Sequence, residues 1–125
     1  MAAPNIVGVT TITGNTAYIS LADTLETELV SNAVGSNLVY KINSIIVAND
    51  DGTNSADISV AYNTVAAGAG ANIWLAKTVA VPADTTLVVL DKASSIYLEE
   101  NRSIVVQASA ANDLDVICSY EIIQS

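Results

Sequence analysis

The amino-acid sequence predicts an all-β fold: an antiparallel β-sandwich, either jelly-roll or immunoglobulin-like, with about eight to nine short strands and little or no helix. Apolar residues alternate with a period of two along several segments, which is the pattern of a strand with one buried face. Turn-forming residues separate these segments at intervals of about 8–12 residues. Hydrophobic residues make up 51% of the chain and charged residues only 14%, and this composition favours strands over solvated helices.

Nine segments fit the description of a strand. Each is rich in aliphatic, β-branched or aromatic residues, and Gly, Pro, Asn or Asp follows most of them as a turn signal. A turn at Gly14-Asn15 is expected between the first two. In chain order the expected strands are residues 5–13, 17–21, 25–31, 38–49, 56–63, 72–81, 85–90, 103–109 and 114–123.

The third segment, 25–31, also has features of a helix. Leu21, Leu25 and Leu29 lie four residues apart, and Ser20 is a candidate N-cap. The alternation within the segment and its β-branched neighbours favour a strand.

Residues 38–49 are apolar on both faces in the second half of the segment, which predicts a central strand covered on each side. The Asp51-Gly52 dipeptide after it suits a hairpin connection. In the next strand, 56–63, alternation places one set of side chains on a common face, and we expect this face in the core: Ala56, Ile58, Val60 and Tyr62.

The stretch 63–74 is rich in Gly and Ala, and it predicts a loose loop. Between the two strands that follow, Pro82 ends the pairing because it lacks an N–H. Trp74, the only tryptophan, alternates out of phase with its large apolar neighbours. It therefore belongs either to a second buried face or to an exposed contact surface.

The last two strands show the clearest alternation. In 103–109 the inward residues are Ile104, Val106 and Ala108. In 114–123 one face carries Leu114, Val116, Cys118, Tyr120 and Ile122. Three tyrosines lie in phase with apolar positions and are expected in the core: Tyr40, Tyr62 and Tyr120.

A length of 125 residues fits one domain with a single core. We expect the sandwich to span residues 9–125. Residues 1–8 are expected to form an N-terminal arm, because Pro4 disfavours regular pairing and the first residues of a domain lie loose unless something holds them.

The net charge of −9 arises from thirteen acidic residues against four Lys and Arg. Four scattered cations cannot form the patch that binding to nucleic-acid phosphates requires, and the same charge disfavours adsorption on anionic lipid. No apolar run approaches the ~20 residues of a transmembrane helix, and no signal peptide is recognisable. The acidity instead suits a basic protein partner.

The sequence lacks the usual parts of an active site or metal centre. There is no His, so a nucleophile has no imidazole base. Cys118 is the only cysteine, so neither an internal disulfide nor a zinc cluster is expected. No glycine motif for phosphate binding occurs, since the stretch 68–72 lacks the Lys and Ser/Thr of a P-loop. The chain is therefore expected to be non-enzymatic and to need no cofactor or metal.

Two groups of carboxylates suggest the opposite: one an enzyme active site, the other a calcium site. Glu99 and Glu100 could form a glycosidase pair, but neighbours on an extended backbone point apart, and a charged turn with Arg102 fits better. Asp50 and Asp51 open a stretch rich in oxygen ligands that suggests calcium. Because the order of acids there departs from the EF-hand pattern, an Asp-Gly turn is the better interpretation.

The C-terminal stretch 81–125 has a recognisable succession: a proline with a small polar turn, an aliphatic strand, the hairpin YLEENRS, the strand IVVQAS and a last strand ending in SYEII. This order resembles the ending of small virion structural proteins of tailed bacteriophages. The opening MAAPNIVGVTTITGNTAY and the stretch KINSIIVANDDGTNSADISV are similar to cyanophage proteins of this kind. One departure is that Asn101-Arg102 replaces the Gly-Asp usual in the hairpin, although Asn tolerates a left-handed backbone.

The resemblance implies a β-sandwich displayed on a virus particle. Its most specific implication is a capsid cement or decoration protein on the capsid surface, bound to the major capsid protein and itself a homotrimer. The arm would then reach a neighbouring subunit and become ordered on assembly, which makes Pro4, Ile6 and Val7 candidate assembly contacts. Trp74 is a fourth candidate, because aromatic side chains often anchor interfaces. The alternative that the resemblance allows is a tail or fibre module that binds a host receptor or glycan.

Overall fold

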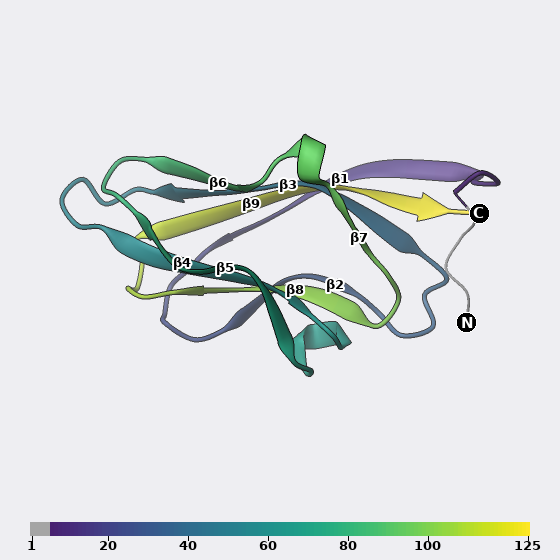
Figure 1. Ribbon diagram of the computed structural model, residues 1–125, viewed down its shortest axis with the longest axis horizontal. Coiled ribbons are helices and arrows are strands. Elements are labelled where there is room, and N and C mark those ends of the chain that lie inside the picture. The colour runs from purple at the N-terminus through teal and green to yellow at the C-terminus, as the bar shows by residue number, and fades with distance from the viewer. Residues whose placement is uncertain (1–5) are drawn as a thin grey trace.

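The computed structural model describes residues 6–125 and consists of two antiparallel sheets packed face to face (Figure 1). This part of the chain forms nine strands and two short 3-10 turns. Their bounds are β1 Thr11–Ser20, β2 Thr27–Asn32, β3 Val39–Asn49, β4 Ala56–Asn63, η1 Ala66–Gly68, β5 Asn72–Val81, β6 Thr86–Leu90, η2 Lys92–Ser94, β7 Ile96–Leu98, β8 Arg102–Ala108 and β9 Leu114–Gln124.

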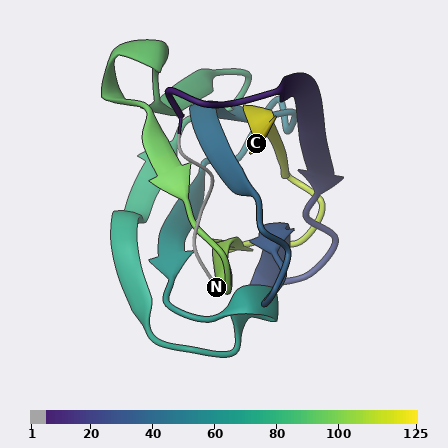
Figure 2. The same cartoon turned by 90° about the vertical axis from the view of Figure 1, so that its right-hand side faces the viewer.

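We call the two sheets A and B, and Figure 2 shows them from one end of the sandwich. Sheet A has the order β1-β9-β3-β6, and β7 also pairs with β3. The first half of β3 pairs with β7 and its second half with β6. Sheet B has the order β2-β8-β4-β5. The expected β-sandwich is therefore confirmed.

The strand pairs are nested along the chain. β1 pairs with β9, β2 with β8, β3 with β6 and β7, and β4 with β5. The chain thus forms one long antiparallel ribbon with the β4–β5 hairpin at its tip. Rolling this ribbon brings β9 beside β3 and β8 beside β4. This is the jelly-roll arrangement, which decides between the two types of sandwich.

The N-terminal strands differ from the prediction. Residues 11–13 and 17–20 of the two expected segments belong to a single strand, β1, and the expected turn at Gly14-Asn15 is wrong. Residues 6–10 of the first expected segment are not strand, and residue 5 lies outside the described residues. Gly14 and Asn15 lie opposite Glu121 and Tyr120 in an unbroken ladder, and the Asn15 side-chain amide donates to the Tyr120 hydroxyl at 2.8 Å. A continuous partner strand thus overrides the local turn propensity.

Two expected hairpins are in fact crossings between the sheets. The Asp51-Gly52 turn links β3 in sheet A to β4 in sheet B, and the turn at 99–101 links β7 in sheet A to β8 in sheet B. Asn101 has φ of 59°, so the left-handed conformation expected for this asparagine is confirmed. β7 itself is not among the nine expected segments.

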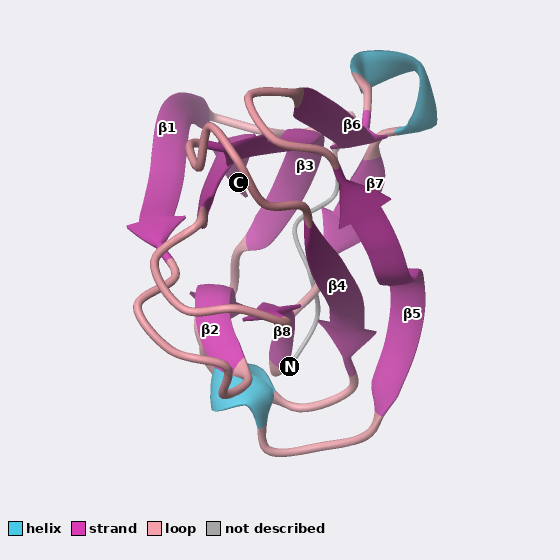
Figure 3. Cartoon of the chain, turned by 90° about the vertical axis from the view of Figure 1, so that its left-hand side faces the viewer, coloured by secondary structure: helices cyan, strands magenta, loops and turns pink. Residues whose placement is uncertain are grey.

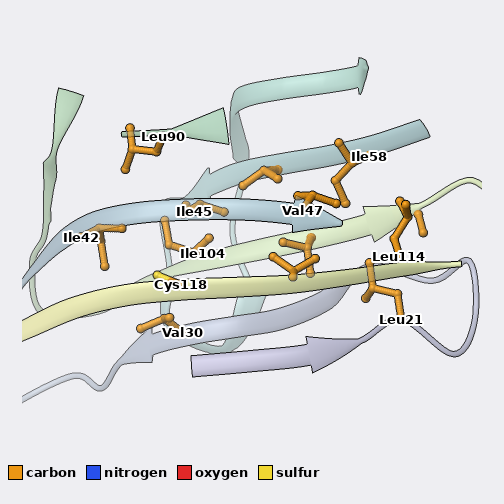
Figure 4. Packing of buried hydrophobic residues seen from close by; sticks show 14 of the residues in the cluster. Leu21, Val30, Ile42, Ile45, Val47, Ile58, Leu90, Ile104, Leu114 and Cys118 are labelled. Atoms are coloured by element: carbon orange, nitrogen blue, oxygen red, sulfur yellow. The ribbon is translucent and has the colours of Figure 1, made fainter. Parts of the chain in front are cut away.

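The core lies between the two sheets (Figure 4). The inward faces predicted for 56–63, 103–109 and most of 114–123 are confirmed, with Tyr62 and Ile122 partly buried at the margin. β3 is the expected central strand of sheet A, but its expected cover on both faces is wrong. Ile45 and Val47 are fully buried, whereas Ile46 between them remains partly exposed on the outer face.

Cys118 is fully buried in this core. Burial raises the pKa of its thiol to about 12, far from the low pKa of a reactive cysteine. The Tyr40 and Tyr120 rings pack nearby with centroids 5.3 Å apart, so Tyr120 is a core residue as predicted and Tyr40 packs partly buried against the core.

Three buried asparagines end three strands: Asn32 ends β2, Asn49 ends β3 and Asn63 ends β4. Each amide donates two hydrogen bonds and accepts at least one. Asn49, for example, donates to the carbonyls of Asn54 and Val81 and accepts from the Asp51 N–H, each at 2.9 Å. Each asparagine thus fixes the loop that leaves its strand while satisfying buried backbone groups.

Candidate functional site

The predicted assembly contacts lie far apart. Pro4 is outside the described residues. Ile6 and Val7 precede β1 and are 53% and 92% exposed. Trp74 lies on β5 and is 38% exposed, with the Lys77 ammonium 4.3 Å from its ring centre. β1 and β5 lie on opposite sides of the sandwich (Figure 3). The described arm residues Ile6 and Val7 and the side chain of Trp74 therefore adjoin different strands.

The outer face of sheet B is partly covered by the chain itself. Val105 and Ala61 point outward from β8 and β4, yet both are buried. The turn η1 lies over this face: a Cβ added to Gly68, which has φ of +70°, would meet Val105 at 3.0 Å. Glycine is needed here both for the close approach and for the left-handed backbone.

The loop that carries η1 is held by side chains from the sheet beneath it. The N–H groups of Ala66, Ala67 and Gly68 donate to Asn101, Ser31 and Ser103 at distances of 2.9–3.2 Å. Asn63 accepts from the N–H groups of Val65 and Gly70 at 3.0 and 2.8 Å. The predicted loose loop is therefore wrong, because polar side chains at strand ends supply the contacts that its own small residues lack.

The outer face of sheet A carries an uncovered apolar row. In the register of the sheet, Tyr18 of β1 faces Ile117 of β9, which faces Ile46 of β3, which faces Val88 of β6. Tyr18 is 79% exposed, and Ile117 and Val88 are also exposed. A contiguous apolar patch of this kind is typical of an interaction surface.

Sequence analysis did not single out this row. Its members come from four strands, and each strand contributes only one side chain to the row. The register that aligns them is a tertiary property. An open hollow of about 220 Å³ lies at the β1–β9 end of the row, lined by Tyr18, Ile19, Ser20, Asp115, Val116 and Ile117.

An acidic cluster adjoins the hollow through Asp115, which interacts with Asp50. Desolvation and the carboxylates of Asp115 and Asp51 raise the pKa of Asp50. Desolvation and the carboxylates of Asp51 and Asp50 raise that of Asp113. The pKa of Asp51 is lowered because the N–H groups of Thr53 and Asn54 donate to its carboxylate.

Asp113→Asn is expected to raise the melting temperature at pH 7 by ~1–3 °C. The folded-state pKa of Asp113 lies above its ordinary value of 3.8, so the folded chain binds this proton more tightly than the unfolded chain. The contribution of the Asp113 carboxyl to the free energy of unfolding therefore falls as the pH rises above 3.8. The melting temperature, measured at several pH values between 4 and 8, should change less with pH for the variant than for the wild type.

Asp57→Asn is the matched control, because it makes the same charge change on β4. An Asp113→Asn variant that melts like Asp57→Asn, or below the wild type, would contradict the repulsion argument.

Glu99 and Glu100 do not form an acid/base pair. The Glu100 carboxylate accepts the Gly35 N–H at 3.1 Å, whereas Glu99 is exposed. Arg102 donates to the backbone carbonyl of Asn101 at 2.9 Å and not to either carboxylate in any contact seen within residues 6–125. The stretch is a structural turn, as expected.

Within the described chain, no group of three or more His, Cys, Asp or Glu side chains is placed to hold a metal ion. In residues 6–125 no helix has the length and apolarity to cross a membrane. The strand order and the exposed side chains define a jelly-roll protein with an apolar row on the outer face of sheet A.

Several solved structures have a fold similar to that of this chain. A chain of the capsid of Helicobacter pylori bacteriophage KHP30 is similar, with a TM-score of 0.53 and 11% identity over 92% of this chain and 89% of that one. A chain of the Bacillus endospore appendages, a family of disulfide-linked pili, is also similar, with a TM-score of 0.52 and 12% identity over 91% of this chain and 88% of that one. A chain of the Ralstonia phage GP4 capsid has a TM-score of 0.48 and 14% identity over 100% of this chain and 92% of that one. No family model and no curated protein matches the chain.

Proposed function

We propose that this chain is a non-enzymatic structural protein of a virus particle, and specifically a capsid cement or decoration protein. In this role it binds the lattice of the major capsid protein at the capsid surface and stabilises the head. The homotrimer that the sequence resemblance implies stays a prediction. This role requires contact surfaces and a stable fold, and it requires no catalytic activity.

The observation that carries the proposal is the fold. A jelly roll spanning β1 to β9 is shared over nearly the whole length with a chain of the KHP30 capsid. Jelly rolls are common among viral capsid domains. The resemblance of the C-terminal stretch to phage virion proteins rests on sequence and therefore supports the proposal independently.

The surfaces support the same role. The apolar row on sheet A offers an uncovered contact face, and the charge of −9 favours a basic partner. We further propose that Pro4, Ile6, Val7 and Trp74 contact neighbouring subunits on the particle. Because Ile6, Val7 and Trp74 are partly or largely exposed, truncating them removes little of the core.

The test is a comparison of virions with and without this protein. Particles that lack it are expected to release their genome at a lower temperature, measured by the fluorescence of a DNA-binding dye during heating. Adding the purified protein should restore the wild-type release temperature and should saturate at hundreds of copies per particle. A chain without residues 1–8 should bind these particles at least tenfold more weakly, because the arm contacts are lost.

The matched control is Val34→Ser, which removes an exposed apolar side chain from the turn between β2 and β3. It should restore the release temperature as the wild type does. Equal release temperatures with and without the protein, or only a few copies per virion by mass analysis, would exclude the cement role.

A tail or fibre module that binds a glycan gains no support from the described surfaces. A glycan-binding module of this kind requires several exposed aromatic side chains on one surface. Trp74 lies on the outer face of sheet B, whereas Tyr18 and Tyr97 lie on strands of sheet A. A glycan array would test this alternative directly, and specific hits would favour it.

A further inference from the structure

The edges of the two sheets differ in how well they are protected against pairing with another chain. Exposed edges invite strand addition, and proteins block them with short strands, bulges and charges. On sheet B, β5 carries Lys77 and two register shifts, and β2 is six residues long with Glu28 and one shift. On sheet A, one edge is divided between β6 and β7, of five and three residues.

The fourth edge, β1, has none of these protections. The strand is ten residues long, TITGNTAYIS, without a charged residue or proline. Its register with β9 runs without a shift from Thr11 to Ser20. No strand within residues 6–125 pairs with its other side, and Figure 3 shows β1 at an outer edge of the sandwich.

The free backbone groups of β1 can be assigned by parity. Just beyond the strand, the Leu21 N–H donates to the Leu114 carbonyl of β9 at 2.9 Å. Hydrogen-bonded pairs recur at every second residue of an antiparallel ladder, so the odd-numbered residues of β1 bond to β9. The even-numbered residues therefore direct their N–H and C=O groups away from β9: Ile12, Gly14, Thr16, Tyr18 and Ser20. Of these groups, the Thr16 N–H donates to the Asn15 side-chain oxygen at 3.0 Å, a bond that pairing with another strand must replace.

We propose that β1 pairs antiparallel with β1 of a second copy of this chain, with Asn15 on the two-fold axis. In this register Gly14 faces Thr16 of the other copy, and Ile12 faces Tyr18. The four-strand path β1-β9-β3-β6 of each copy then continues into that of its partner. The pairing is isologous and closes with two copies, which makes it a different assembly from the trimer that the resemblance implies.

Two observations favour a second copy as the occupant. First, the side chains are self-complementary: Ile12 and Tyr18 lie on the same face, are 54% and 79% exposed, and would cover each other as a cross-strand pair. Second, β1 itself carries no charged residue, so its pairing with β1 of another copy sets no like charges opposite each other, although each chain has a net charge of −9. Because the remaining repulsion is screened by ions, added salt should strengthen the pairing.

The test compares Gly14→Pro with Gly14→Ala. Nothing lies within 4 Å of an added Cβ at Gly14, so Gly14→Ala should not clash within the chain. The residue before proline prefers an extended backbone, which Thr13 has in β1. The Gly14 N–H points away from β9, so proline removes only an edge donor. Light scattering during gel filtration should show the wild type and Gly14→Ala at twice the 12.9 kDa of one chain. Gly14→Pro should raise the dissociation constant at least ~10-fold, since two hydrogen bonds are lost.

Asn15→Cys checks the register even if Gly14→Pro does not fold. On the two-fold axis the two Cα atoms would lie about 4.5 Å apart, within the range of a disulfide, so mild oxidation should give a linked dimer. Thr13→Cys is the control, because its two copies would lie about 13 Å apart. A wild type that is monomeric at millimolar concentration or trimeric, a folded Gly14→Pro that associates normally, or an Asn15→Cys that stays unlinked overturns the pairing. Particle binding is measured separately, so either proposal can fail alone.

Discussion

Replacing Asn63 by alanine is expected to lower the free energy of unfolding by about 2–4 kcal/mol. Asn63 is fully buried at the end of β4. Its amide accepts from the N–H groups of Val65 and Gly70 and donates to the Gly70 carbonyl and to Asn72. The substitution leaves several part-buried polar groups without partners, and each such group is costly in a protein interior.

The measurement is urea unfolding followed by tryptophan fluorescence, since Trp74 lies on β5 next to this loop. Asn54→Ala is the matched control, because Asn54 is exposed and, within residues 6–125, its side chain bonds only to Asp51. It should cost less than about 1 kcal/mol. Hydrogen exchange should also quicken at residues 65–70 in Asn63→Ala. A loss as small as that of the control would show that the loop does not depend on this side chain.

The second large effect is expected from Leu98→Ala, at about 2–5 kcal/mol. Leu98 is fully buried although β7 has only three residues. Its side chain joins the core cluster, and its carbonyl accepts from the Asn32 amide at 3.0 Å. Truncation opens a cavity at a point where the flanking turns leave the chain little freedom to collapse.

Tyr97→Ala is the control for this variant, because the neighbouring side chain points to the outer face and is exposed. It should cost less than about 1 kcal/mol in the same urea titration. If both variants lost similar stability, β7 would be contributing through its backbone pairing with β3 and not through the Leu98 side chain.

The parts of the fold that the sequence predicts are those decided by local periodicity. The alternation in 56–63, 103–109 and 114–123 identifies the core faces, because each of these strands buries one face against the other sheet. The same reasoning fails for β1, where Gly14-Asn15 favours a turn. There the partner β9, more than a hundred residues later in the chain, keeps the strand extended.

The candidate surfaces were predicted less well, for a related reason. Trp74 was singled out from its rarity and its phase, and its side chain is 38% exposed; its role as a contact residue stays a prediction. The apolar row of Tyr18, Ile117, Ile46 and Val88 was not, because it exists only once four strands are in register. The covering of Val105 by the loop at η1 was equally hidden, since it depends on hydrogen bonds from distant side chains.

The nesting of the strand pairs also sets the order in which the molecule can be completed. The β4–β5 hairpin is local and can form while the rest of the chain is still being made, whereas Thr11 must wait for Gln124. Folds dominated by such distant pairings form slowly. Among the described strands β1 is made first and its partner β9 is made last. Until β9 has been made, a growing chain carries an uncharged strand with both edges open, which favours premature pairing with another chain.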